Sequence, residues 1–163
     1  MGVSEAVAKS YLDQPVYTPT QNLILVDSLA RLGAATGRDA YLTASMVAAD
    51  ETEANFFVNM AQTLRGYHEM VGPITGITMV GALTVAQTRS GVAVIPFALD
   101  YGVWTVNADR LSQNMKTTYK APGFNGSYEI WITGTASPRA KQELRARGFT
   151  VVEEAGSRFD IFD

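Results

Sequence analysis

The spacing of apolar residues along the chain changes near residue 72. Before that point apolar residues recur every three or four positions, which is typical of amphipathic helices. After about residue 74 they recur every second position, as in half-buried strands. Gly72 and Pro73 stand between the two patterns. The spacing therefore predicts a helical part at about residues 4–71 and a sheet-containing part at about 74–163.

The helical part contains several start signals. Ser4 can cap a first helix, and Thr18-Pro19-Thr20-Gln21 matches a capping box with proline in the first helical position. Asp50 precedes the longest predicted helix, which runs to about Met70. Its apolar residues cover a wide arc, so we expect this helix to be buried between layers.

The sheet-containing part begins with two runs rich in β-branched residues, separated by a turn at Arg89-Ser90-Gly91. Pro96 cannot donate a ladder hydrogen bond, so the returning strand is expected to be an edge strand or to be bulged there. Asn107 is predicted to cap a helix that continues through Met115.

The last third reads as strand, turn, helix and strand. Residues 128–132 alternate polar and apolar positions, Ser137 and Pro138 open a helix, and Gly148 closes it before a final strand. These elements predict an α+β fold with an α/β-like C-terminal unit, in which the helical N-terminal half packs on a small mixed sheet and the helices lie on one face of that sheet. A chain of 163 residues suits a single domain, 1–163.

The content of charged and apolar residues indicates which kinds of partner the protein can have. Charged residues make up 18% and apolar residues 47%, so we expect part of the surface to be covered by a protein partner or a second copy; a compact domain with a neutral surface is the alternative. The net charge of −3 argues against nucleic acid. Apolar runs fall short of the roughly 20 residues that span a bilayer, so the sequence predicts no membrane span.

Cofactor and metal chemistry find little support. The chain has no cysteine and one histidine, which excludes thiolate ligands, iron–sulfur clusters and a histidine-rich metal site. Calcium-loop spacing is also missing, so we expect neither metal nor cofactor. The lack of cysteine leans slightly toward an extracytoplasmic location and leaves the compartment open.

His68 is the candidate general base, with Glu69 or Asp100 as its partner in a hydrolase-type enzyme. No serine stands in the small-residue elbow of a nucleophile. The simpler interpretation of His68 is a core or interface residue that hydrogen-bonds the backbone.

The turn before the last helix is the candidate ligand site. A loop that leads into a helix N-terminus can offer free amides to an anion, and hydroxyls and a guanidinium would add donors. The residues concerned are Thr133, Gly134, Thr135, Ser137 and Arg139. The loop has a single glycine, unlike phosphate-binding loops, so an ordinary turn is the alternative.

Three aromatic residues, Phe97, Tyr101 and Trp104, are predicted to form an interface or line a pocket, with core anchoring as the alternative. The leading hypothesis for function is a non-catalytic binding or assembly domain, part of a larger or oligomeric protein. A small-molecule or anion-binding domain using the turn at Thr133–Arg139 comes second. A hydrolase using His68 comes third.

Overall fold

The computed structural model describes residues 2–159 and 161. Helices dominate the first part of the chain, and strands and helices alternate in the rest. The elements are α1 (Glu5–Leu12), α2 (Pro19–Arg31), α3 (Arg38–Ser45), α4 (Glu51–Met70), β1 (Ile74–Val80), β2 (Leu83–Thr88), β3 (Ala93–Phe97), β4 (Tyr101–Gly102), α5 (Val106–Thr118), β5 (Tyr128–Ile132), β6 (Thr135–Ala136), α6 (Pro138–Ala146), β7 (Phe149–Val152) and α7 (Ala155–Arg158). The predicted α+β class is confirmed.

The helix starts predicted at Thr18 and Asp50 are confirmed. Thr18 and Gln21 exchange both bonds of the capping box, at 2.7 and 3.2 Å. The side chain of Asp50 accepts a hydrogen bond from the amide of Glu53, and α4 then runs for 20 residues to Met70. No helix among the described residues is long and apolar enough to cross a membrane.

The main sheet has the strand order β1-β2-β3-β5-β7. The β1–β2 and β2–β3 pairs are antiparallel, whereas β3, β5 and β7 are parallel. The expectation that Pro96 marks an edge strand is wrong, because β3 lies in the middle of the sheet. Pro96 instead lies beyond the point where β2 and β3 stop pairing, which is Val94, and its register partner is Trp131 in β5.

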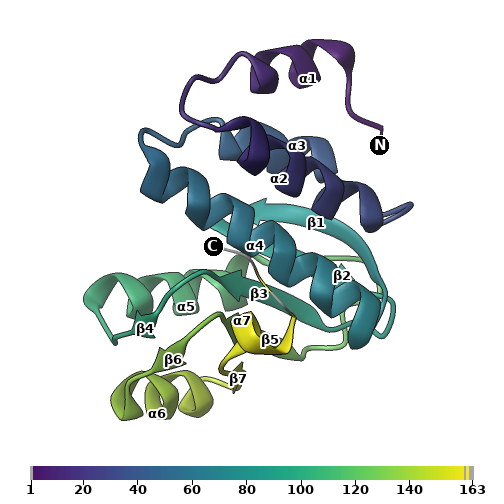
Figure 1. Ribbon diagram of the computed structural model, residues 1–163. Helices are drawn as coiled ribbons and strands as arrows, with labels where there is room; N and C mark the ends of the chain where they lie inside the picture. The colour runs from purple at the N-terminus through teal and green to yellow at the C-terminus, as the bar shows by residue number, and fades with distance from the viewer. Residues whose placement is uncertain (1, 160, 162–163) are drawn as a thin grey trace.

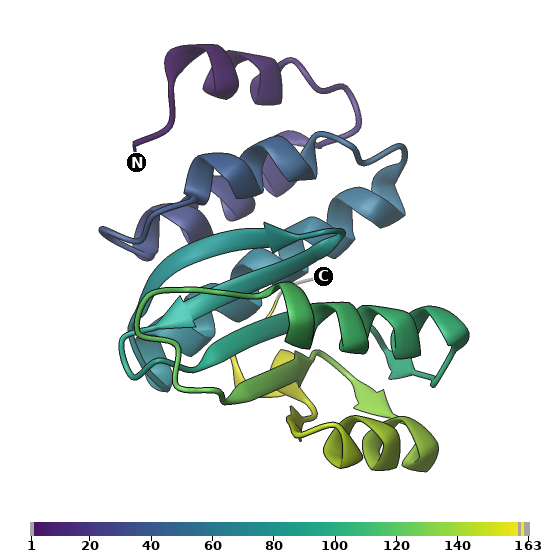
Figure 2. The same ribbon diagram turned by 180° about the vertical axis from the view of Figure 1, so that it is seen from behind.

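Helices cover both faces of this sheet. Alternate residues point to opposite sides: Ala86, Val94 and Trp131 belong to the core beneath α4, while Val85, Ile95 and Ile132 belong to the core beneath α5 and α6. In Figure 1 α4 crosses in front of the sheet, and in the reverse view of Figure 2 α5 lies in front. Our expectation of helices on one face is therefore wrong, because both sets of inward residues are apolar and both need cover.

A second, two-stranded sheet extends the first. The predicted turn at residues 133–136 contains β6, which pairs in parallel with β4. Gly134 permits this arrangement, since a Cβ there would collide with the carbonyl oxygen of Asp100. After β4, Thr105 caps α5 by accepting a hydrogen bond from Ala108 at 3.1 Å. The prediction of Asn107 as the cap is wrong, because Asn107 lies inside the first turn.

Candidate functional site

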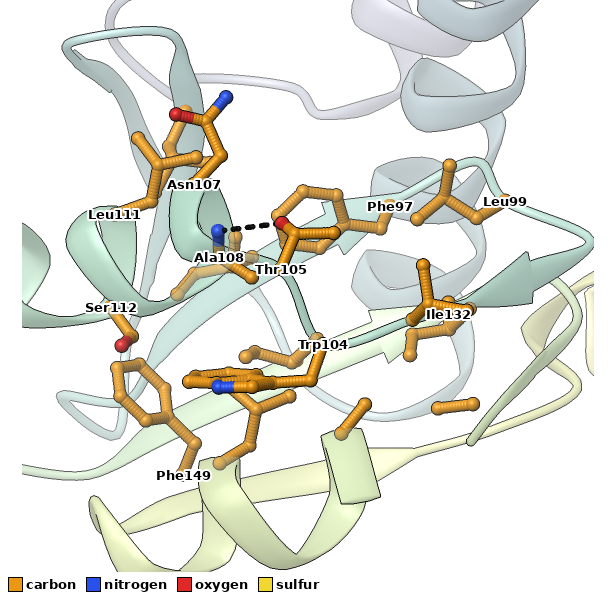
Figure 3. Close-up of a pocket in the computed structure, with 18 of the residues that line it drawn as sticks. Phe97, Leu99, Trp104, Thr105, Asn107, Ala108, Leu111, Ser112, Ile132 and Phe149 are labelled. Carbon is orange, nitrogen blue, oxygen red and sulfur yellow. Dashed lines mark hydrogen bonds between the residues drawn. The ribbon is translucent and has the colours of Figure 1, made fainter. Parts of the chain in front are cut away.

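An apolar pocket of about 230 Å³ lies between the second face of the sheet, α5 and α6 (Figure 3). Its walls come from eight strands and helices and from the loops before and after β4. The lining residues are Leu83, Ile95, Phe97, Leu99, Gly102, Val103, Trp104, Thr105, Asn107, Ala108, Leu111, Ser112, Met115, Ile130, Ile132, Ala136, Ala140, Leu144 and Phe149. None of these lining residues is ionisable.

The spacing of small and apolar residues on α5 explains one wall. Ala108, Leu111, Ser112 and Met115 recur at helical spacing and form the face that α5 turns toward the sheet. Met115 is completely buried and fills one end of this space. The backbone of α5 comes close to other described elements at only a few points, so the helix stands off the sheet and leaves the pocket beneath it.

Three polar side chains at the pocket, those of Thr105, Asn107 and Ser112, already have partners within the chain. The hydroxyl of Thr105 is engaged in capping α5, and the Asn107 carbonyl oxygen accepts a hydrogen bond from Arg110 at 2.7 Å. The Ser112 hydroxyl donates to the carbonyl oxygen of Asp109 at 2.7 Å. A ligand would therefore meet an apolar interior in which an uncompensated charge is costly to bury.

Arg147 lies against Trp104, one of the residues that line the pocket. Its guanidinium lies 4.7 Å from the ring centroid of Trp104 and bonds to Asp109 in α5 and Glu143 in α6, both at 2.6 Å. Hydrogen bonds to Glu143 and Asp109 hold the pKa of Arg147 above its ordinary value. The charge of Arg147 is thus engaged by the two helices that it joins.

Exposed apolar side chains stand beside the pocket on residues 99–106, which we call the rim segment. Leu99, Tyr101, Val103 and Val106 are 40%, 57%, 56% and 88% exposed. Leu99 and Val103 also line the pocket, so the exposed and enclosed apolar surfaces are continuous. Such a patch on a chain with few charges is typical of an interaction site.

The structure brings the three predicted interface aromatics to this region. Phe97 and Trp104 line the pocket, and Tyr101 lies on the rim segment. Figure 3 shows the Trp104 ring lying across the pocket near Phe149. Their role in an interface stays a prediction.

The candidate catalytic residues are not brought together. His68 lies in the last turn of α4, where its Nδ1 accepts a hydrogen bond from the amide of Ile74 at 3.0 Å. Glu69 is exposed, 3.8 Å from Arg31. Asp100 lines a separate polar cleft with Asn59, which precedes His68 on α4 by nine residues, or about 13 Å of helix.

That polar cleft, of about 360 Å³, contains two residues of the predicted anion site, Thr133 and Gly134. Their amides are already paired, with Phe97 and Leu99 carbonyl oxygens at 3.0 and 2.8 Å. The Thr133 hydroxyl also donates to Leu99, at 3.1 Å. These donors are therefore engaged in holding β3, β5 and the following loop together.

The backbone amides of Thr135 and Ser137 are engaged as well. The amides of Thr135 and Ser137 donate to carbonyl oxygens of the β4 strand region, and the Ser137 hydroxyl caps α6. The Glu153 carboxylate accepts a hydrogen bond from the amide of Ala136 at 2.8 Å and one from Lys141 at 3.1 Å. The backbone hydrogen bond, joined by that from Lys141, lowers the pKa of Glu153. Arg139 is exposed on α6.

Sequence reasoning missed most of the pocket walls. Leu111, Ala140 and Phe149 come from three elements far apart in the chain, and only the fold brings them together. Two signals were available. One is the single apolar face of α5, and the other is the uncharged stretch Tyr101–Val106, which carries three of the four exposed apolar residues of the rim segment.

Comparison with protein-family models, with curated proteins and with solved structures finds no match. Within residues 2–159 and 161, no three histidine, aspartate or glutamate side chains gather as metal ligands. The function is therefore argued from the geometry of the pocket and its rim.

Proposed function

We propose that the protein is a non-catalytic binding domain whose ligand places an uncharged apolar group in the pocket between α5, α6 and the sheet. The observation that carries the proposal is the continuity of this pocket with the exposed rim segment. A buried apolar cavity gives binding energy to a ligand that fills it, and an exposed apolar rim gives a further surface for contact.

The volume limits the size of the group. An apolar cavity of about 150 Å³ is enough for benzene. At about 230 Å³ the pocket accommodates one aromatic ring or a short alkyl chain. It is small for a whole drug-sized molecule, so the bound group is best regarded as one part of a larger ligand.

The chemistry of the lining supports binding over acid–base catalysis. General acid–base chemistry needs a titratable group within hydrogen-bond reach of the reacting atoms. The described residues of the pocket include none, and the nearby Arg147 is already paired with two carboxylates. We therefore place the binding hypothesis ahead of the hydrolase.

Small apolar probes test the proposal. 1-Hexanol and benzene should raise the thermal midpoint and shift the NMR signals of α5 residues that line the pocket. Hexanoate and hexylammonium, of matched chain length, should bind at least about tenfold more weakly, because each would bury a charge without a partner.

A filled pocket provides the matched control. Ala108→Leu places a larger side chain in the pocket and should abolish hexanol binding while the protein stays folded. Ala146→Leu makes the same change at an exposed position of α6 and should bind hexanol normally. The proposal fails if neither neutral probe perturbs the wild-type protein, or if Ala108→Leu binds them unchanged.

A further inference from the structure

One edge of β4 has no partner strand among the residues that the structure describes. On its other edge, β4 pairs with β6 through the carbonyl oxygens of Asp100 and Gly102. The backbone groups of Tyr101 and Val103 point away from β6, and nothing in the described part of the chain hydrogen-bonds to their amides or carbonyl oxygens. Both residues are more than half exposed.

This edge is self-complementary. In an antiparallel pair, residues whose backbones point toward each other exchange two hydrogen bonds, and they alternate with residues that exchange none. If two copies meet about a two-fold axis at Gly102, Tyr101 of each copy faces Val103 of the other, and the arrangement gives four hydrogen bonds. Directly opposed residues without hydrogen bonds approach most closely, and two glycines there leave room for the contact.

The β4 edge also lacks the features that usually prevent an edge strand from pairing with another chain. Natural edges are commonly protected by lysine, proline or inward-pointing charge. Residues 101–106 contain neither proline nor a charged side chain, and the single charge of the rim segment is the exposed Asp100, which directly precedes β4. A strongly charged partner would find no opposite charge on residues 101–106. A second apolar rim segment, in contrast, matches them.

We infer that a second copy of this chain binds at the β4 edge, forming a two-fold symmetric dimer in which the rim segments cover the pockets. This inference rests on the proposed function, because the apolar group that enters each pocket then comes from the rim of the other copy. In this dimer the four exposed rim side chains become buried, at the same interface where the backbone hydrogen bonds between the two copies form.

Sedimentation velocity from micromolar to millimolar protein tests the dimer. We expect a mass of two chains at high concentration that falls to one chain on dilution. The amides of Tyr101 and Val103 should be protected from hydrogen exchange in the dimer and should lose this protection on dilution.

Two variants and one control separate edge pairing from other modes of association. Val103→Pro removes one donor per copy and should weaken the dimer at least about tenfold, while Val103→Thr keeps the amide and the side-chain shape and should still dimerise. Tyr101→Lys places a charge on an exposed edge position and should also give monomers without loss of folding, as checked by circular dichroism.

A monomer at every concentration overturns the inference, and so does a dimer that survives both Val103→Pro and Tyr101→Lys. Hexanol binding, measured at a dilution where the protein is monomeric, distinguishes this failure from failure of the proposed function. A monomer that binds hexanol keeps the binding pocket and loses only the second copy as its partner. A protein that neither dimerises nor binds the neutral probes loses both.

Discussion

The two faces of the sheet are closed in different ways. On the first face, α4 packs so closely on its neighbours that a Cβ at Gly66 would overlap the Phe159 side chain. On the second face, α5 stands off the sheet and a pocket remains beneath it. Dense packing on one face supports the fold, while incomplete packing on the other leaves room for a ligand.

Shortening one leucine on each face gives the largest expected difference. Leu64 in α4 is fully buried, so Leu64→Ala should lower the free energy of unfolding by about 3 kcal/mol. Leu111 already lies against empty space, so Leu111→Ala should lower it by about 1 kcal/mol. Urea unfolding of the two variants measures both losses, and equal losses would contradict the contrast between the faces.

Removing the Arg147 contacts should increase local opening of α5, on the pocket face of the sheet, and leave α4 unaffected. Arg147→Met removes the bonds to Asp109 and Glu143 but keeps an apolar side chain over Trp104. Amide hydrogen exchange in α5 should become faster, whereas exchange in α4 should be unchanged. Arg139→Met removes an exposed charge from the same helix as a control, and it should change neither rate.

The smallest expected effect concerns acid stability at the start of α6. The lowered pKa of Glu153 means that its ionised form stabilises the fold at neutral pH, and that this contribution is lost as the pH falls through the lowered pKa. Glu153→Gln should therefore reduce stability at neutral pH and flatten its decline in acid. Urea unfolding across pH, with Glu154→Gln as the neighbouring control, measures this difference; parallel pH curves would contradict it.

Local chemistry made much of the fold predictable. The capping residues Thr18, Asp50 and Ser137 act within a few positions of themselves, so their roles are visible in sequence. The central place of β3 and the pairing of β4 with β6 depend on distant strands, and no local pattern encodes them. The expectation for Pro96 fails for this reason, since a missing hydrogen-bond donor does not reveal where neighbouring strands separate.

In the candidate site too, features set by neighbouring residues were predictable and features set by distant residues were not. Phe97, Tyr101 and Trp104 are close in sequence, and their common location was therefore predictable. The pocket wall formed by Ala140 and Phe149 needs the parallel return of β5 through α6 to β7, which only the fold supplies. The predicted anion site depends on free amides before α6. One of these amides, that of Ala136, donates a hydrogen bond to Glu153, and their separation of 17 residues along the chain hides this contact from a local reading of the sequence.

The placement of Trp104 gives the protein a built-in optical reporter. The chain has two tryptophans. Trp131 is buried to 5% exposure and stacked on Phe159, so its fluorescence should stay constant as the pocket fills. Trp104 faces the cavity, with Arg147 against its ring, and its emission should move to shorter wavelength when a ligand displaces water. Occupancy of the pocket can thus be followed by tryptophan fluorescence alone, without an added label.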